Sequence, residues 1–361
     1  MNTKKNKNKT VKYPVSRNLK MLHNASIFRP VKRGRRRVGV KHNFESAGTK
    51  VAIEMAEELD VADQDLMIGL FAIARSKEFS TLALSETAWV AENGKPQSVK
   101  KTMGISLGVF QFGTIPSSEL RSIQISISKY ELLKELGRAQ GGKEYASLTK
   151  SLKRLASTTY HHDGEKWCGS FSMLSFLEDK ESEHLLITIN PVASYAIRKD
   201  EEGYVLQHRG ERGRLKSEEA RVLHSVICSL VDPNKQVNLN LKMLVSKVWG
   251  NGQDDWSRVA PKTLMERYGD DVTLAEIEAL MNKELQSENP TIRKVGIDYE
   301  VLNPVASPKT VRNRMSALKK VLVEEINTLG SWSVEVVGRG DKATVRIRRK
   351  KATKSLLELS G

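Results

Sequence analysis

Apolar positions repeat along this chain with two different periods, and the switches between them predict an order of helices and strands. A helical repeat predicts helices at residues 65–75, 129–136, 144–158, 217–231, 241–249 and 309–329. Alternation at every second residue predicts strands near residues 124–128, 170–177, 185–189, 237–240, 332–337 and 344–348. Residues 160–164, Tyr-His-His-Asp-Gly, are expected to form the tip of a hairpin. The fold class predicted is therefore α+β.

The order helix, strand, helix, helix, hairpin occurs twice and is typical of the winged helix, in which the second helix of the helix-turn-helix enters the major groove. We therefore expect two tandem winged-helix domains, at 46–205 and 206–354, followed by a short tail at 355–361. Residues 250–308 are more than a winged helix needs and are interpreted as an insertion. Within it, residues 274–285 form an amphipathic, mostly acidic pattern that argues against DNA contact.

The helix predicted at 309–329 has the strongest signal for DNA binding. Its apolar stripe consists of Val311, Met315, Leu318, Leu322, Ile326 and Leu329. Arg312 and Asn313 lie opposite that stripe and are the candidates for reading bases, because arginine bonds guanine and asparagine bonds adenine in a bidentate way. The candidates for the remaining contacts, mainly to phosphate, are Lys309, Arg314, Ser316 and Lys320. An ordinary amphipathic surface helix is the alternative interpretation, although its first four turns contain no acid.

Two further segments are expected to face DNA. The helix at 144–158 has a leucine-rich seam, and its other face carries Lys150, Lys153 and Arg154. The strands at 332–337 and 344–348 flank a Gly-Arg-Gly-Asp turn and would form a basic wing, with Arg339 and Lys342 near its tip.

Charge is concentrated at the two ends of the chain. The net charge is +16 over 361 residues, and residues 1–50 alone contain fifteen Lys/Arg and one acid. Such an excess indicates a polyanionic partner, of which nucleic acid is the commonest. Residues 1–45 are expected to be a disordered basic arm whose candidates for phosphate contact are Arg33, Arg35, Arg36 and Arg37. A solvated tail that only aids solubility is the alternative.

Catalytic and metal sites are not indicated by the sequence. Gly137–Lys143 resembles a phosphate-binding loop, but Glu144 stands where a Mg²⁺-binding hydroxyl is required. His161 and His162 are adjacent, whereas rolling-circle nickases separate their metal ligands by an apolar residue. Cys168 and Cys228 lie among apolar residues without metal-ligand spacing and are expected to be buried thiols of a reducing cytosol.

No apolar run is long enough to span a membrane, and the basic N-terminus lacks the apolar stretch of a secretory signal. We expect a cytoplasmic protein that is not an enzyme and needs no cofactor or metal.

Three stretches resemble the replication initiators of IncQ-type plasmids, the RepC class. They are IFRPVKRGRRR (27–37) with the helix at 65–75; LITINPVA (186–193) with SEEARVLH (217–224) and LVDPNK (230–235); and VW (248–249) with TVRNR (310–314) and SWSVE (331–335). The resemblance implies two winged helices that bind direct repeats (iterons) of an origin as duplex DNA. It also implies opening of a neighbouring A·T-rich segment, recruitment of a replicative helicase and no catalytic site. The insertion at 250–308 departs from the family pattern.

The alternative functions are a tandem winged-helix transcriptional repressor and a nicking enzyme. A repressor of this kind usually dimerises and has an effector pocket, for which no sequence feature stands out. The sequence leaves the oligomeric state open, a homodimer included, and it does not identify the repeat sequence or the source of the helicase.

Overall fold

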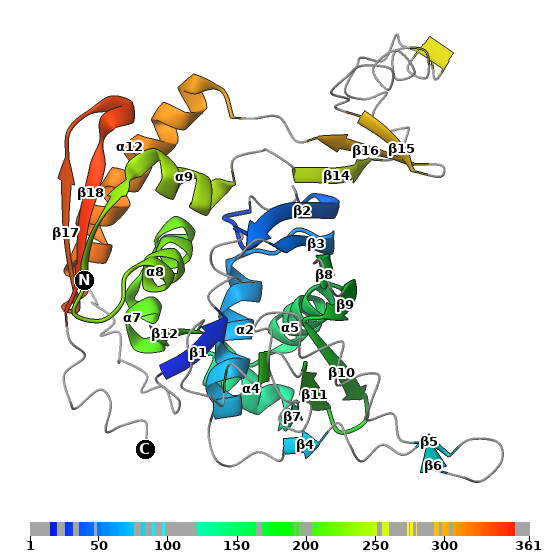
Figure 1. Cartoon of the computed structure of the whole chain (residues 1–361). Helices are drawn as coiled ribbons and strands as arrows, with labels where there is room; N and C mark the ends of the chain where they lie inside the picture. The colour runs from blue at the N-terminus through cyan, green and yellow to red at the C-terminus, as the bar shows by residue number, and fades with distance from the viewer. Residues whose placement is uncertain are drawn as a thin grey trace.

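A computed structural model describes most of the chain. The residues described are 15–19, 26–31, 36–46, 49–75, 81–83, 89–90, 96–97, 121–163, 168–190, 193–194, 197, 204–250, 255–259, 273, 275–276, 279, 292–295, 298–302 and 306–350. Helices and strands both contribute throughout, which confirms the mixed class (Figure 1).

The first hydrophobic core is centred on a helix with few polar positions. This helix, α2 (Val61–Arg75), is buried along most of its length. Asp60 and Asp63 cap its start reciprocally, because each carboxylate accepts a hydrogen bond from the other residue's backbone N–H, at 3.0 Å in both cases. The helices α4 (Lys129–Glu135) and α5 (Gly142–Ala156) and a four-stranded sheet complete this core. The strands of that sheet are, in order, β10 (Leu174–Asp179), β11 (His184–Ile189), β7 (Arg121–Ser128) and β4 (Thr81–Ala83).

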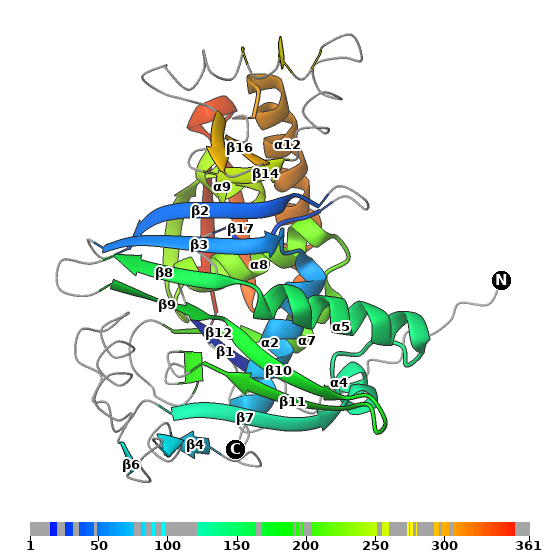
Figure 2. The same cartoon turned by 90° about the vertical axis from the view of Figure 1, so that its right-hand side faces the viewer.

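A second sheet joins segments that are far apart in the sequence. Its seven strands are, in order, β15 (Ile292–Val295), β16 (Asp298–Leu302), β14 (Asp255–Val259), β2 (Val38–Ser46), β3 (Thr49–Glu57), β8 (Thr159–Asp163) and β9 (Cys168–Ser172). The three strands of the inserted segment thus extend the sheet of the N-terminal half (Figures 1 and 2). We call residues 36–194 the first unit.

The second hydrophobic core lies in the C-terminal part of the chain, residues 215–250 and 306–350, which we call the second unit. Its elements are α8 (Glu218–Leu230), β13 (Gln236–Asn240), α9 (Leu241–Trp249), α12 (Pro308–Glu324), β17 (Trp332–Val337) and β18 (Thr344–Arg349). Side chains of Ser217, Asn240 and Ser307 cap the three helices by accepting backbone N–H bonds. Gly250 ends α9 at a φ of 77°, a conformation that suits glycine.

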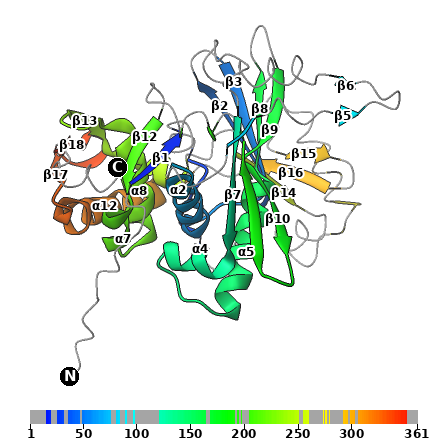
Figure 3. The same ribbon diagram turned by 90° about the horizontal axis from the view of Figure 1, so that it is seen from below.

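The two units meet through a junction of three short elements. Strand β1 (Val15–Leu19) pairs with β12 (Tyr204–His208), and helix α7 (Arg209–Arg214) follows directly. In Figure 3, α2 lies between the second unit on one side and the sheets of the first unit on the other. Two small 3₁₀ turns, Ile326–Thr328 and Gly340–Lys342, and the short pair β5 (Trp89–Val90) and β6 (Pro96–Gln97) are the remaining elements described.

The basic N-terminal segment is not a disordered arm up to residue 45, as the sequence had suggested. It supplies β1 and β2, and Ile27 and Phe28 are buried in the first core at 1% and 2% exposure. The physical reason is that β2 alternates and pairs with β3 over its length, so backbone pairing outweighs the local charge. Arg33 and Arg35 lie outside the described residues.

Other boundaries differ from the sequence prediction as well. Residues 160–163 belong to strand β8 and not to a hairpin tip, because Tyr160 is buried and stacks on Phe171 with ring centroids 5.0 Å apart. The single strand expected at 170–177 is two strands that are separated at Met173. The long C-terminal helix ends at Glu324 and continues as a 3₁₀ turn. Of the acidic helix expected at 274–285, residues 275, 276 and 279 are described, and Thr273 and Glu276 cap each other at its start.

Candidate nucleic-acid interface

Helix α12 presents a polar face to solvent and an apolar face to the second core. Met315, Leu318 and Leu322 are buried, as the apolar stripe predicted. The exposed face contains Lys309, Arg312, Asn313, Ser316 and Lys320. Pro308 occupies the first turn, where a missing backbone donor costs little, and that turn contains no acid. The polar side chains near the start of the helix are therefore available to a ligand in a groove.

Arg314 behaves differently from the other basic residues of α12. Its guanidinium lies over the ring of Trp249, 5.7 Å from the centroid. Burial and the nearby charge of Arg29 lower the pKa of Arg314. The contact with α9 means that Arg314 packs between helices, which differs from the phosphate contact expected for it.

The hairpin of β17 and β18 carries exposed cations at its tip and on its outer face. Arg339 and Lys342 are exposed on either side of Gly340, whose φ is 57°. On β18, buried Val345 and Ile347 alternate with exposed Arg346 and Arg348. The two arginines were not among the predicted site residues, although the period-two pattern of residues 344–348 signals them.

The hairpin is not uniformly basic. Arg346 donates to Glu335 at 2.7 Å, and Lys242 Nζ lies 3.7 Å from Asp341 Oδ2. Both pairs are exposed, so water screens them and each contributes little to stability. A phosphate could therefore compete for either cation at small cost.

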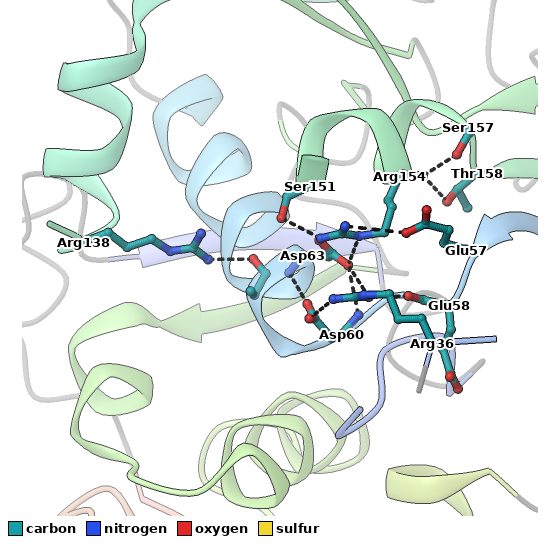
Figure 4. Close-up of polar contacts among 11 residues, drawn as sticks. Arg36, Glu57, Glu58, Asp60, Asp63, Arg138, Ser151, Arg154, Ser157 and Thr158 are labelled. Carbon is teal, nitrogen blue, oxygen red and sulfur yellow. Dashed lines mark hydrogen bonds and ion pairs between the residues drawn. The ribbon is translucent and has the colours of Figure 1, made fainter. Parts of the chain in front are cut away.

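Helix α5 keeps two of its three predicted cations at the surface and turns the third inward. Lys150 and Lys153 are exposed. Arg154 instead donates two hydrogen bonds to the fully buried Asp63 of α2, from Nε to Oδ2 at 2.9 Å and from Nη2 to Oδ1 at 2.7 Å (Figure 4). Burial opposes the charge of Arg154, but Asp63 outweighs it and raises the pKa of Arg154. Arg154 thus holds α5 against α2, which differs from the DNA contact predicted.

Arg36 and Arg37 are also bound internally. Arg36 pairs with Asp60, donates to the backbone carbonyl of Glu58 and lies 3.4 Å from Asp63 (Figure 4). Arg37 donates from Nε to Glu58 at 3.1 Å. The phosphate contacts predicted for these two arginines therefore give way to ion pairs whose acidic partners lie more than twenty residues further along the chain.

The hairpin of β10 and β11 in the first unit has the opposite charge from that of β17 and β18. Its tip exposes Asp179, Glu181 and Glu183 beside Lys180. Hydrogen bonds from Ser182 and the Glu181 backbone lower the pKa of Asp179, so this carboxylate is ionised at neutral pH. An acidic tip repels phosphate, so this hairpin is unsuited to the backbone contact that a basic wing makes.

Histidine, cysteine and acidic side chains are the groups from which a metal or catalytic centre would be built. The described residues contain no group of three or more His, Cys, Asp or Glu side chains that could hold a metal ion. His161 lies 3.6 Å from Glu54 on the neighbouring strand, and both are partly exposed. Cys228 is buried, as expected, while the side chain of Cys168 lies outside what the structure describes. None of the described helices combines the length and the apolar character that crossing a membrane requires.

Comparison with known proteins gives one family and several distant structures. The family model described as replication protein C (RepC) matches residues 17–281, well over half of the chain. No curated protein matches the chain. Solved structures similar to the chain include "RctB domains 2-3", at 11% identity over 94% of this chain and 99% of that chain with a TM-score of 0.40. Another is the "Pi initiator protein in complex with iteron DNA", at 10% identity over 94% of this chain and 98% of that chain with a TM-score of 0.33.

Proposed function

The chain belongs to the RepC family of replication proteins, and from that premise we propose that it is a plasmid replication initiator that binds the direct repeats (iterons) of its origin as duplex DNA. The observation that carries the proposal is the exposed face of α12, on which Lys309, Arg312, Asn313, Ser316 and Lys320 gather opposite a buried apolar stripe.

The proposal assigns base reading to the N-terminal half of α12. Groove-bound helices place their first turns against base edges. Arg312 and Asn313 are exposed there and can each form two hydrogen bonds to one base, guanine and adenine respectively. Lys309 and Lys320 would contact phosphate on the flanks, and Arg339 and Lys342 would contact phosphate from the hairpin tip.

Both units are proposed to be winged helices. In the second unit the order α8, β13, α9, α12, β17, β18 supports this, with α9 and α12 as the helix-turn-helix and the inserted residues between them. In the first unit, α2, β7, α4, α5, β10 and β11 follow the same order. Helix α5 would then enter a second major groove with Lys150 and Lys153 toward the DNA.

The remaining steps of initiation are part of the proposal and rest on the family. We propose that repeat binding opens a neighbouring A·T-rich segment and recruits a replicative helicase, for which the acidic segment at 274–285 is the candidate docking site. The protein would act in the cytoplasm, without a cofactor and without catalysis of its own, and a homodimer would be compatible with this role.

Footprinting on the origin of the cognate plasmid tests the proposal. The expected result is protection of each direct repeat, with a supercoiled plasmid left intact in the presence of Mg²⁺ or Mn²⁺. Protection confined to a promoter palindrome would favour a transcriptional repressor. Metal-dependent nicking would contradict the non-catalytic role.

A further inference from the structure

Helix α7 is a short polar helix at the junction of the two units, yet most of its charged side chains are buried. Its sequence is RGERGR, and Arg209, Glu211 and Arg212 are exposed by 9%, 6% and 4%. Charged groups lose their hydration when they are buried, so each needs a well-placed partner. The partners of these three residues come from both units.

Two arginines of α7 bind the first unit. Arg209 donates to the side chain of Glu135, the last residue of α4, at 2.6 Å and to the Glu135 carbonyl at 2.7 Å. Arg212 donates from Nε to Asp65 at 2.5 Å and from Nη2 to Gln64 at 2.8 Å, both on α2. These hydrogen bonds connect α7 with α2 and α4, the helices that pack with α5 in the first core.

The same helix binds the second unit through Glu211 and the other side of Arg212. Arg212 Nη1 donates to the Ser225 hydroxyl of α8 at 2.8 Å and to the Arg221 carbonyl. Glu211 lies 3.3 Å from His224 of α8 and accepts from Trp332 Nε1 of β17 at 3.3 Å and from the Ser331 hydroxyl. Burial opposes the charge of Glu211, but the bonds from His224 and Ser331 outweigh it and lower its pKa to about 2.

A second attachment joins the units on another side. Strand β14, which follows α9 in the sequence, pairs with β2, with Asp255 opposite His42 and Trp256 opposite Lys41. The chain then returns through β15 and β16 to α12. The segment between the two helices of the second unit is therefore tied to the first unit before α12 begins (Figure 1).

Charged contacts of this kind hold one geometry more strictly than apolar packing does. A sliding apolar surface keeps most of its contact area, but a buried arginine that slides by a few ångströms loses its partner and keeps its desolvation cost. Arg212 restricts the relative position of the units most, because its guanidinium donates to Asp65 of α2 and to Ser225 of α8 at the same time.

We infer that α7 is the positioning element that fixes the distance and rotation between the two DNA-reading units, and so sets the spacing of the base pairs they recognise within one repeat. The inference rests on the proposed function. Arg209, Arg212 and their partners Asp65 and Glu135 act through α5 and α12 and do not themselves contact DNA.

A spacing series tests the inference. The DNA probes are the cognate repeat and derivatives with one or two base pairs added or removed between the two segments that the units protect. One added base pair moves the far segment by ~3.4 Å and turns it by roughly 35°. The wild-type protein should lose ~10-fold or more in affinity when the first base pair is added or removed, because only one unit can then bind in register.

The variant that loosens the junction is Asp65→Asn combined with Glu135→Gln, which keeps the size of both side chains and removes both charges. Its spacing profile should flatten to less than about threefold for the first base pair added or removed, with weaker binding to the natural repeat. The matched control is Arg214→Gln, a change at an exposed residue of the same helix, which should keep the wild-type profile. A flattened variant whose thermal unfolding matches the control supports the inference, whereas a profile as steep as that of the wild type overturns it.

A measurement without DNA separates this inference from the proposed function. Spin labels are introduced through non-canonical amino acids at Lys150 and Lys320, which are exposed on α5 and α12. The wild type should give one narrow distance distribution and the double variant a broader one. Equal widths would refute the role of α7 even if the repeat is bound. Absence of repeat binding by the wild type, with a narrow distribution, would refute the function and leave the rigid junction standing.

Discussion

Helix α12 of the second unit and helix α5 of the first unit are both rich in lysine and arginine, but they use these residues differently. On α12, Lys309, Arg312 and Lys320 point to solvent. On α5, Lys150 and Lys153 are exposed, whereas Arg154 donates hydrogen bonds to buried Asp63. The hairpins differ in the same sense, since the tip of β17–β18 carries Arg339 and Lys342 and the tip of β10–β11 carries Glu181 and Glu183.

This difference indicates a division of labour between the units. Affinity for DNA rises with the number of phosphates that cations neutralise. The second unit offers more cations, so it should supply most of the salt-dependent affinity. The first unit offers fewer and keeps an acidic hairpin, so it should add selectivity in position more than strength.

The carboxylate of Asp63 is buried beneath α5 of the first unit and pairs with Arg154. Asp63→Ala should lower the free energy of unfolding by about 3–5 kcal/mol, because it leaves Arg154 and Arg36 without their buried partner. Urea denaturation measures this change. The matched control is Glu57→Ala, since Glu57 also lies 3.7 Å from Arg154 but its side chain is 47% exposed.

The control should cost about 1 kcal/mol or less, as partly exposed ion pairs usually do. Equal losses for Asp63→Ala and Glu57→Ala would show that burial of the carboxylate is not what anchors α5. The DNA affinity of the folded fraction of Asp63→Ala should fall for the same reason, because α5 loses its orientation against α2.

Much of the fold could be predicted from local patterns in the second unit. Helix α8 has Ser217 as its cap and glutamates in its first turn, and α9 has Asn240 as its cap and Gly250 as its stop. The RepC resemblance also rested on short local motifs, and the family match confirms it. Strands β1 and β2 were missed because the many lysines and arginines of residues 1–50 suggested a disordered arm, and because their pairing partners β12 and β3 cannot be read from local sequence.

The candidate site was less predictable where a side chain depends on a distant partner. Arg154 lies at the edge of the polar face of α5, and its partner Asp63 is 91 residues away. No helical wheel reveals that partner, so the prediction assigned Arg154 to DNA with its lysine neighbours. Arg312 and Asn313 raise no such difficulty, since their exposure follows from the apolar stripe of their own helix.

Rising pH should destabilise the second unit more than the first, because the second unit contains a buried histidine, His224, with a raised pKa. In the second unit, burial opposes protonation of His224, but Cys228 and Glu211 outweigh it and raise the pKa of His224 to about 9. A raised pKa stabilises the folded form fully below the unfolded pKa of about 6.5, and this contribution is lost as pH rises through 9. The second unit should therefore lose on the order of 1–3 kcal/mol between these values, while the buried Arg154–Asp63 pair of the first unit contains no imidazole.

Cys228 is a second titratable group in contact with His224, with 3.8 Å between Sγ and Nε2, so its contribution must be separated from that of His224. Burial opposes its ionisation, but the charge of His224 lowers the pKa of Cys228, so the thiolate stabilises the folded unit at alkaline pH. Thermal unfolding is therefore followed in a Cys228→Ser background, with and without His224→Gln. The Cys228→Ser change removes one of the two partners that raise the pKa of His224, so the alkaline decline should be smaller than in the wild type. It should still be present with His224, through Glu211, and should flatten without it. A decline of equal slope in both proteins would assign it to other groups.

The third prediction addresses sequence reading by the second unit. Arg312→Ala should weaken binding to the origin repeat by ~1–3 kcal/mol and blur the preference at one base pair, because a bidentate contact to guanine is lost. Binding to a library with each position of the repeat randomised measures both effects. Ser316→Ala on the same exposed face is the matched control and should cost less. Uniform weakening across all sequences would reassign Arg312 to phosphate.

The smallest expected effect is on the salt dependence of DNA binding, to which phosphate contacts of both units would contribute. Lys320→Ala should weaken binding to all DNA about equally and reduce the slope of log affinity against log salt by ~1, because one fewer counterion is released. Its contact with Glu324, 3.9 Å away and exposed, is too weak to hold the lysine from DNA. Lys150→Ala on α5 is the counterpart and should reduce the slope by a similar amount if α5 also lies in a groove. A changed slope for Lys320→Ala together with an unchanged one for Lys150→Ala would mean that only the second unit contacts phosphate through its helix, and α5 would then have to be removed from the proposed interface.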